Sequence, residues 1–233
     1  MSNAPGDVEL SRLLSLTAHE IRNPLSPLQG FMQFVLKDKK NEISAQQREW
    51  LQTSMNCAGR LHELANQLSD YAKLVKGEVT LSRKPTQVDT LLRDVIAALP
   101  PDKERGVAVE LSGEGKARII QGDPLHLSKA FTWIFRALRL EVGQSGKLYV
   151  VVDEGDYQGK PANWVLVGDE DQLNVLRQQP RNALGWFDNK ERGNLGVTLW
   201  IAEWILKAHD GGIWAPPSVP KGGGALVALP TLK

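Results

Sequence analysis

The stretch Thr17-Ala-His-Glu-Ile-Arg-Asn-Pro-Leu25 places a histidine, a carboxylate and an amide within about one helical turn and follows them with a proline. Apolar residues run through it and beyond it with a 4-3-4 spacing, at Leu14, Ala18, Ile21, Leu25, Leu28, Met32 and Val35. A spacing that averages about 3.5 residues is typical of a helix in a coiled coil or bundle. At about 100° per residue, these positions lie on average about 150° away from His19, so the imidazole is expected to face solvent.

A second helix is predicted after the polar stretch from Lys37 to Ile43. Ser44, with Gln47 three residues later, forms a capping box, and Gly77 is typical of the residue just past a helix end. Between them the same spacing recurs at Trp50, Cys57, Leu61, Leu64, Leu68, Tyr71 and Val75. Residues 8–76 are therefore predicted to form a long helical hairpin.

One hairpin cannot surround such an apolar seam by itself. Two hairpins can do so as a four-helix bundle, with Cys57 and the leucines inside. We therefore expect a homodimer through the hairpin. The alternative is that both helices pack on the remainder of the same chain.

Charge and cysteine content exclude several classes of protein. The chain has 28 Lys+Arg against 27 Asp+Glu, a net charge of +1, whereas a nucleic-acid-binding protein usually carries a strongly basic surface. The single cysteine, Cys57, excludes an intramolecular disulfide and fits a reducing compartment. No apolar run approaches the ~18–20 residues that cross a bilayer, and no signal-peptide pattern opens the chain. We expect a cytoplasmic protein with no membrane segment and no nucleic-acid partner.

The composition changes after Gly77. Residues 77–84 are predicted to be a linker and residues 85–230 an α/β sandwich, in which helices cover one face of a mixed sheet. The predicted helices span about 87–99, 124–141 and 195–209, and the strands are Val107–Leu111, Ala117–Ile120, Lys147–Asp153, Trp164–Val167 and Gly224–Leu229. The fold class expected for the whole chain is α+β.

Two prolines lie inside the first predicted helix. Pro24 has no N–H, so the carbonyl of Glu20 loses its intrahelical partner, and Pro27 does the same to Asn23. At about 3 kcal/mol each, these residues are costly in a purely structural helix. We expect a local kink directly below the exposed His19.

The chemistry predicted for His19 is nucleophilic. A neutral imidazole is a competent nucleophile near neutral pH. The neighbouring Glu20 can hold the other ring nitrogen in the right tautomer and accept its proton as phosphorus is attacked. Asn23 can orient a water for the reverse, hydrolytic reaction. The alternative is an ordinary surface histidine near a helix bend.

The residues His19-Glu20-Ile21-Arg22-Asn23-Pro24-Leu25 resemble the H-box of bacterial sensor histidine kinases, within their dimerisation and histidine-phosphotransfer hairpin. The resemblance implies that His19 is the phospho-acceptor and Glu20 the general base. It also implies that Asn23 supports dephosphorylation of a response-regulator partner.

Residues 85–230 are similar in layout to the ATP-binding (Bergerat) domain of these kinases. The likeness is carried by Gly122-Asp-Pro-Leu-His-Leu127, by Ile201-Ala-Glu-Trp-Ile-Leu-Lys-Ala-His-Asp-Gly-Gly-Ile213 and by Pro220-Lys-Gly-Gly-Gly-Ala-Leu-Val-Ala-Leu-Pro230.

The nucleotide motifs of that family are degenerate in this sequence. The helix that should carry a magnesium-binding asparagine reads Ala130-Phe-Thr-Trp-Ile-Phe-Arg-Ala-Leu138. Asp169 matches the adenine-binding aspartate, but Glu170, Asp171 and Gln172 replace the glycine-bearing turn. In the last glycine box only Gly196 aligns, and the lid, about 174–191, is short. Asp169 and Gly196 are thus residual nucleotide positions, no residue is predicted to ligate a metal, and ATP binding is not expected.

An intact H-box beside degenerate nucleotide motifs favours a phosphorelay histidine phosphotransferase. In this hypothesis His19 exchanges a phosphoryl group with response-regulator aspartates, and the Mg²⁺ belongs to the receiver domain of the partner. One alternative is an ATP-dependent sensor histidine kinase with a divergent pocket for ATP and Mg²⁺. Another is a non-enzymatic dimeric scaffold that binds a receiver domain.

Overall fold

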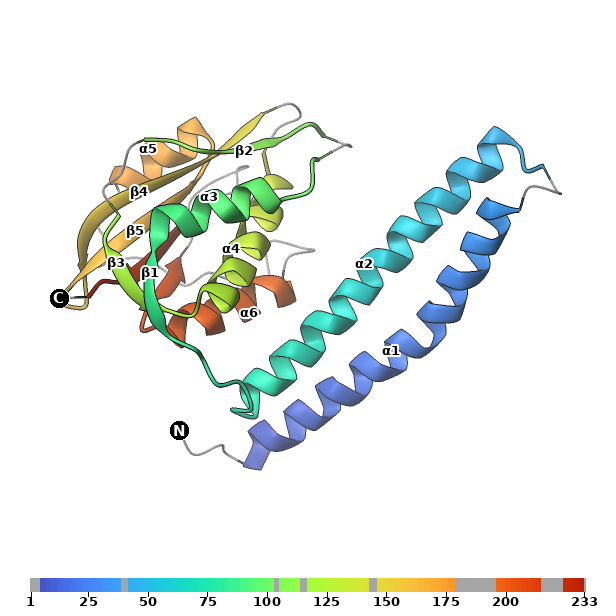
Figure 1. Ribbon diagram of the computed structural model, residues 1–233, viewed down its shortest axis with the longest axis horizontal. Helices are drawn as coiled ribbons and strands as arrows, with labels where there is room; N and C mark the ends of the chain where they lie inside the picture. Colours follow the sequence, from blue (N-terminus) through green and yellow to red (C-terminus); the bar gives the residue numbers. More distant parts are fainter. Residues whose placement is uncertain are drawn as a thin grey trace. The chain divides into compact units, whose positions relative to one another are not determined.

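The computed structural model describes residues 5–38, 42–102, 105–113, 117–142, 146–178, 196–214 and 224–232. The chain divides into two compact units, Met1–Thr80 and Leu81–Lys233. The first unit holds the helices α1 (Pro5–Lys37) and α2 (Ala45–Val75), which form the hairpin (Figure 1). The second unit, the sheet domain, holds the helices α3 (Val88–Ala98), α4 (Pro124–Arg139), α5 (Glu170–Gln178) and α6 (Gly196–Lys207).

Both ends of α2 have the caps that the sequence predicts. The Ser44 hydroxyl accepts from the Gln47 N–H at 3.1 Å, and the Gln47 side chain accepts from the Ser44 N–H at 2.8 Å. At the other end Gly77 has a positive φ of 70°. Its N–H donates to Leu74 and that of Glu78 donates to Lys73, so the last carbonyls of the helix are satisfied.

The interior of the hairpin is built on a strict seven-residue spacing. Ser11, Ala18, Leu25 and Met32 are buried on α1, and Ala58, Ala65 and Ala72 on α2. Alanines are short, so the two helix axes can approach closely along this line. On α1, Ala18, Leu25 and Met32 belong to the predicted seam. On α2 the prediction was off by one position, since the buried alanines directly follow Cys57, Leu64 and Tyr71.

A second apolar stripe of the hairpin stays exposed. It includes residues of the predicted seam, Leu28, Val35, Trp50, Cys57 and Leu61, together with Leu10, Leu13, Phe31 and Phe34. Cys57, expected inside a bundle, is therefore exposed in the single chain. The seven-residue pattern holds two neighbouring stripes, and one hairpin buries only the stripe between its own helices.

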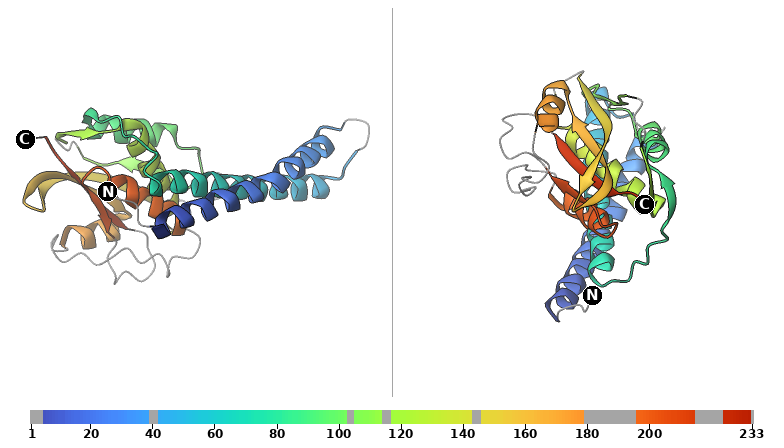
Figure 2. Two further views of the ribbon diagram at one scale, coloured as in Figure 1. Left: turned by 90° about the horizontal axis from the view of Figure 1, so that it is seen from below. Right: turned by 90° about the vertical axis from the view of Figure 1, so that its left-hand side faces the viewer.

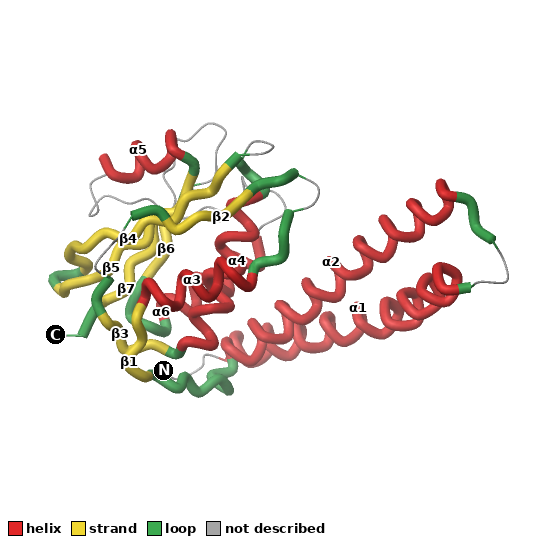
Figure 3. Tube along the Cα trace, turned by 45° about the horizontal axis from the view of Figure 1, so that its top comes forward, coloured by secondary structure: helices red, strands yellow, loops and turns green. Residues whose placement is uncertain are grey.

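The sheet domain contains two sheets. The larger has the strand order β2-β4-β5-β7-β6, with a parallel pair only between β2 and β4, and the smaller pairs β1 with β3 (Figure 3). The strands are β1 (Lys84–Gln87), β2 (Ala108–Leu111), β3 (Ile119–Gly122), β4 (Lys147–Tyr157), β5 (Lys160–Gly168), β6 (Gly212–Trp214) and β7 (Ala225–Pro230). The helical hairpin followed by a domain with a mixed sheet confirms the predicted α+β class.

Helices lie on both faces of the larger sheet. In Figure 2, α3, α4 and α6 lie on one face and α5 on the other. Leu173 and Leu176 of α5 pack on the second face, where the strands present Val151, Trp164, Leu166, Leu226 and Ala228. The sequence predicts helices on one face only, so α5 is an element that it missed.

Candidate functional site

The site residues predicted from the sequence lie on α1. Ala18 is fully buried against α2, while the neighbouring His19 and Glu20 are exposed, as is Asn23. Because residues four apart share one face of a helix, Asn23 lies beside His19, and its Nδ2 is 3.3 Å from the Nδ1 of the ring. The hairpin thus presents an imidazole, a carboxylate and an amide together to solvent.

The contact between Asn23 and His19 couples the orientation of the amide to the tautomer of the ring. When the Asn23 Nδ2–H donates to Nδ1, the ring proton is on Nε2 and Nδ1 holds the free electron pair. When the amide is turned by half a rotation, its oxygen accepts from Nδ1–H and Nε2 becomes the nucleophilic nitrogen. A side chain that rotates between these states selects which nitrogen can attack.

Both prolines lie inside α1, which continues through them. The carbonyls of Glu20 and Asn23 therefore have no N–H donor four residues later. The adjacent Ser26 hydroxyl donates to the Arg22 carbonyl at 3.2 Å, a bond to the preceding turn that often bends a helix. The weakest main-chain hydrogen bonding of α1 is thus immediately below His19.

The second candidate region, the residual nucleotide position Asp169, caps a helix. Its Oδ1 accepts from the Gln172 N–H at 2.9 Å at the start of α5. A Cβ added to Gly168 would lie 2.7 Å from the Cβ of Gln172, so the chain is already close-packed at this turn. Glu170 and Asp171 add two exposed carboxylates, which favour a helix N-terminus and repel a triphosphate.

Among the described residues, the α4 segment and Gly196 do not form a phosphate site. The α4 segment expected to carry a metal ligand buries apolar side chains, among them Phe131 and Phe135, whose ring centroids are 5.8 Å apart. Gly196 is the first residue of α6, and the remaining lid and glycine-box positions, 179–195, lie outside the described residues. The residues present at Asp169 and on α4 do not fit a magnesium–nucleotide complex.

A polar cluster missed by the sequence analysis joins the start of α4 to the end of α6. Asp123 Oδ1 caps α4 by accepting from the N–H groups of Leu125 and His126, and Oδ2 accepts from the Ser82 N–H at 2.8 Å. Although burial favours the protonated acid, these hydrogen bonds and the nearby His126 together lower the pKa of Asp123. The Asp123 carboxylate therefore holds the chain that enters the sheet domain.

His209, also in this cluster, is 4% exposed. Its Nε2 accepts from the Asp123 N–H at 2.9 Å, and its Nδ1–H donates to the Ile205 carbonyl at 2.7 Å. Both ring nitrogens are thus used by the neutral form, and burial lowers the pKa of His209. The sequence alone assigns no role to His209, because its partner Asp123 is 86 residues away along the chain.

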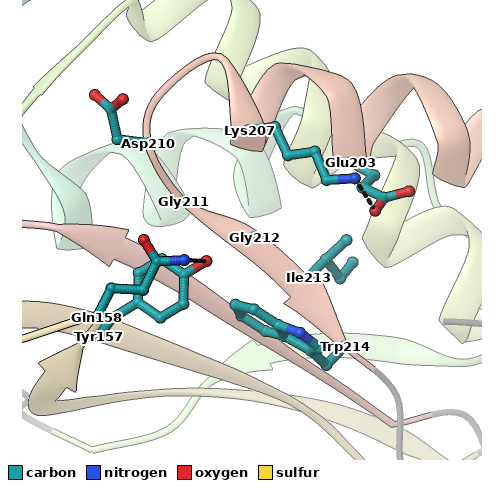
Figure 4. A pocket seen from close by; sticks show the side chains of 9 residues that line it. All are labelled: Tyr157, Gln158, Glu203, Lys207, Asp210, Gly211, Gly212, Ile213 and Trp214. Atoms are coloured by element: carbon teal, nitrogen blue, oxygen red, sulfur yellow. Dashed lines mark hydrogen bonds and ion pairs between the residues drawn. The ribbon is translucent and has the colours of Figure 1, made fainter. Parts of the chain in front are cut away.

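A surface cavity of about 380 Å³ lies beside the edge strand β6 (Figure 4). Tyr157 and Trp214 form its aromatic wall, with ring centroids 5.3 Å apart. Its charged groups pair with neighbours, Lys207 with Glu203 at 2.7 Å and Asp210 with Arg83 at 2.9 Å. The cavity adjoins the turn that precedes β5, whereas Asp169 follows the end of that strand, so it is not the nucleotide position.

Comparison with known proteins shows what the hairpin is similar to. Residues 9–77 match the His Kinase A (phospho-acceptor) domain. The chain is 29% identical over 154 residues to probable histidine kinase 4 of Oryza sativa subsp. japonica, covering 65% of this chain and 15% of that protein. It is 30% identical over 125 residues to the signal transduction histidine-protein kinase BarA of Escherichia coli (strain K12), covering 52% of this chain and 13% of that protein. The chain thus spans less than a sixth of the length of these relatives.

Solved structures extend the likeness to the sheet domain. The crystal structure of full-length ShkA in complex with AMPPNP has a TM-score of 0.61 and 19% identity, covering 93% of this chain and 44% of that one. Acinetobacter baumannii histidine kinase AdeS has a TM-score of 0.60 and 16% identity, covering 92% and 98%. The chain therefore resembles these histidine kinases in fold, with a helical hairpin followed by a mixed α/β domain. No helix in the described part of the chain has the length and apolarity needed to cross a bilayer.

Proposed function

We propose that this protein is a phosphorelay histidine phosphotransferase that exchanges a phosphoryl group between His19 and the aspartate of a response-regulator receiver, without using ATP. The observation that carries the proposal is a contrast within one chain. His19 is exposed beside Glu20 and within 3.3 Å of Asn23, whereas Asp169 is engaged as the N-cap of α5.

The transfer step needs only the groups present on α1 and the phosphorylated partner. The unprotonated ring nitrogen of His19 attacks the phosphorus of an aspartyl phosphate. The P–O bond to the aspartate breaks, the N–P bond forms, and the carboxylate leaves. The proton on the other ring nitrogen passes to Glu20 or to water. Positioning and the receiver's own Mg²⁺ supply the catalysis.

Asn23 has two tasks in this scheme. In the resting ring it selects the attacking nitrogen through its contact with Nδ1. In a separate, hydrolytic reaction its amide orients a water that attacks the aspartyl phosphate of the partner, so that the P–O bond to the aspartate breaks and inorganic phosphate is released. Exposure of all three side chains allows a receiver domain to reach them.

The exposed apolar stripe of the hairpin supports a homodimer as the working form. Phe31 is 69% exposed and Phe34 72% exposed, which is unusual for large aromatic side chains clustered on one helix. Leu10 and Leu28 are each nine residues from His19, so at 100° per residue they lie on the opposite side of α1. A second hairpin can cover this stripe in a four-helix bundle and leave His19 free.

The experiment that decides between transfer and autokinase activity uses two phosphoryl donors. The full chain is incubated with Mg²⁺ and radiolabelled ATP, and separately with phosphoramidate, which phosphorylates reactive imidazoles directly. We expect phosphoramidate to phosphorylate His19 in the wild type and to leave His19→Gln unmodified. We expect radiolabelled ATP to label neither protein. Label from ATP on His19 would instead establish an ATP-dependent histidine kinase. A chain that binds receiver domains although its His19 is not phosphorylated would establish the non-enzymatic scaffold.

A further inference from the structure

Arg22 lies within the H-box, and its side chain is directed at α2. Its Nε donates to the Asn66 Oδ1 at 3.0 Å and its Nη2 donates to the Ala65 carbonyl at 3.2 Å. The same Nη2 also donates to the Ser69 hydroxyl. These contacts join two turns that are more than forty residues apart in the sequence, and we call them the Arg22 clamp.

The Arg22 clamp is placed where α1 has lost main-chain hydrogen bonds. Pro24 and Pro27 leave the carbonyls of Glu20 and Asn23 without helical donors. On the N-terminal side of this turn the interior is lined by the small Ala18 and Ala65, while Ile21 and Leu25 pack in the apolar cluster that follows. Side-chain bonds to α2 therefore replace the rigidity that the prolines remove.

The rotation of this turn decides where His19 points. Arg22 is three residues from His19 and directly precedes Asn23, so all three share one turn of backbone. The 3.3 Å contact between Asn23 and the ring depends on the helical spacing of that turn. A fixed Arg22 thus fixes both the direction of the imidazole and the tautomer that Asn23 selects.

We propose that Arg22 is a positioning residue for phosphoryl transfer, which acts by holding the His19 turn against Asn66 and Ser69 of α2. This inference rests on the proposed function of His19. The competing role for an arginine here is direct binding of the phosphoryl group. Three of the five guanidinium N–H groups point to α2 in the clamp, which favours positioning.

The test compares variants of the full chain labelled with ¹⁵N-histidine. Arg22→Met removes the clamp and Arg22→Lys retains a single donor group. Asn66→Leu/Ser69→Ala removes the two side-chain acceptors and leaves Arg22 with the Ala65 carbonyl alone. Arg48→Met is the matched control, because Arg48 also bonds across the hairpin, to the Leu36 carbonyl at 3.3 Å, but at the far end. Each protein is assayed for the rate of His19 phosphorylation by phosphoramidate and for the two ring ¹⁵N shifts of His19, and its helicity is checked by circular dichroism.

In Arg22→Met we expect phosphorylation to slow about tenfold, a modest cost for a misplaced nucleophile. The ¹⁵N shifts of the two ring nitrogens should move towards each other, because one tautomer is no longer favoured. Asn66→Leu/Ser69→Ala should show both effects to a smaller degree, since the bond to the Ala65 carbonyl remains, and should add nothing to Arg22→Met. Arg22→Lys should be intermediate, and Arg48→Met should match the wild type. We expect each variant to keep the helicity of the wild type by circular dichroism, so that these changes do not reflect unfolding.

Two results would overturn the inference. One is a ring signature in Arg22→Met that matches the wild type. The other is a slow Arg22→Met beside a wild-type Asn66→Leu/Ser69→Ala, which would assign Arg22 to direct phosphoryl binding. If wild-type His19 is not phosphorylated at all, the proposed function fails, while the ring shifts still report whether the clamp orients His19.

Discussion

Glu20 is the residue beside His19 that can take its proton. A positioned general base contributes about a hundredfold or more to a rate, so Glu20→Gln is expected to slow phosphorylation of His19 by about that factor. Glu49→Gln, an exposed glutamate on α2, is the matched control and should retain the wild-type rate. Equal rates in Glu20→Gln and the wild type would remove Glu20 from the chemistry.

His209 makes the stability of the sheet domain depend on pH. Burial lowers the pKa of this imidazole below its ordinary 6.5, so the unfolded chain binds the proton more tightly than the folded one. The contribution of neutral His209 to the free energy of unfolding is complete above pH 6.5. It is lost as the pH falls towards the lower pKa of the folded state. Arg83 adds to the lowering, while Asp123 opposes it.

The measurement is the midpoint of thermal unfolding between pH 7.5 and pH 5.5. We expect the wild-type midpoint to fall with pH and His209→Gln to show a shallower dependence. Parallel curves for the two proteins would mean that His209 does not carry the effect.

At the scale of elements, α5 depends on the Asp169 cap. Replacing an N-cap residue with alanine costs about 1 kcal/mol, whereas asparagine caps almost as well as aspartate. Asp169→Ala should therefore lower the free energy of unfolding by about 1 kcal/mol, and Asp169→Asn should stay near the wild type. Denaturant unfolding of the wild type, Asp169→Ala and Asp169→Asn measures these differences in the free energy of unfolding.

The same variants test whether Asp169 retains an adenine-binding role. A ligand that binds only the folded state stabilises it, by about 2.7 kcal/mol at a concentration one hundred times its Kd. We expect no stabilisation of the wild type by Mg²⁺ and ATP. Stabilisation that disappears in Asp169→Ala would show that the cap and the nucleotide share this carboxylate.

At the scale of the whole molecule, the proposed homodimer depends on the exposed apolar stripe. Phe31→Asp places a charge in the middle of this stripe and should convert the dimer into a monomer, as measured by sedimentation. Gln33→Asp is the matched control, since Gln33 is exposed two residues away but about 200° round α1. A monomeric wild type would contradict the four-helix bundle, and a dimeric Phe31→Asp would place the contact elsewhere.

Much of the hairpin could be predicted from residues that are close together in the sequence. The seven-residue periodicity predicts α1 and α2, and Ser44, Gln47 and Gly77 mark the ends of α2 because capping involves residues close in the chain. The pairing of His19 with Asn23 also follows from helical spacing alone. Helix α5 was missed because it is short and opens with acidic residues, so its apolar Leu173 and Leu176 gave too weak a period.

The sequence by itself determined the two long helices, the exposed histidine and the loss of the nucleotide motifs, since each depends on neighbouring residues. Only the tertiary structure decided which apolar stripe lies between α1 and α2, that Arg22 binds Asn66 and Ser69, and that Asp123 meets His209. Periodicity gives the side of a helix on which a residue lies but not the partner that it meets. Those partners are set by the packing of segments more than forty residues apart.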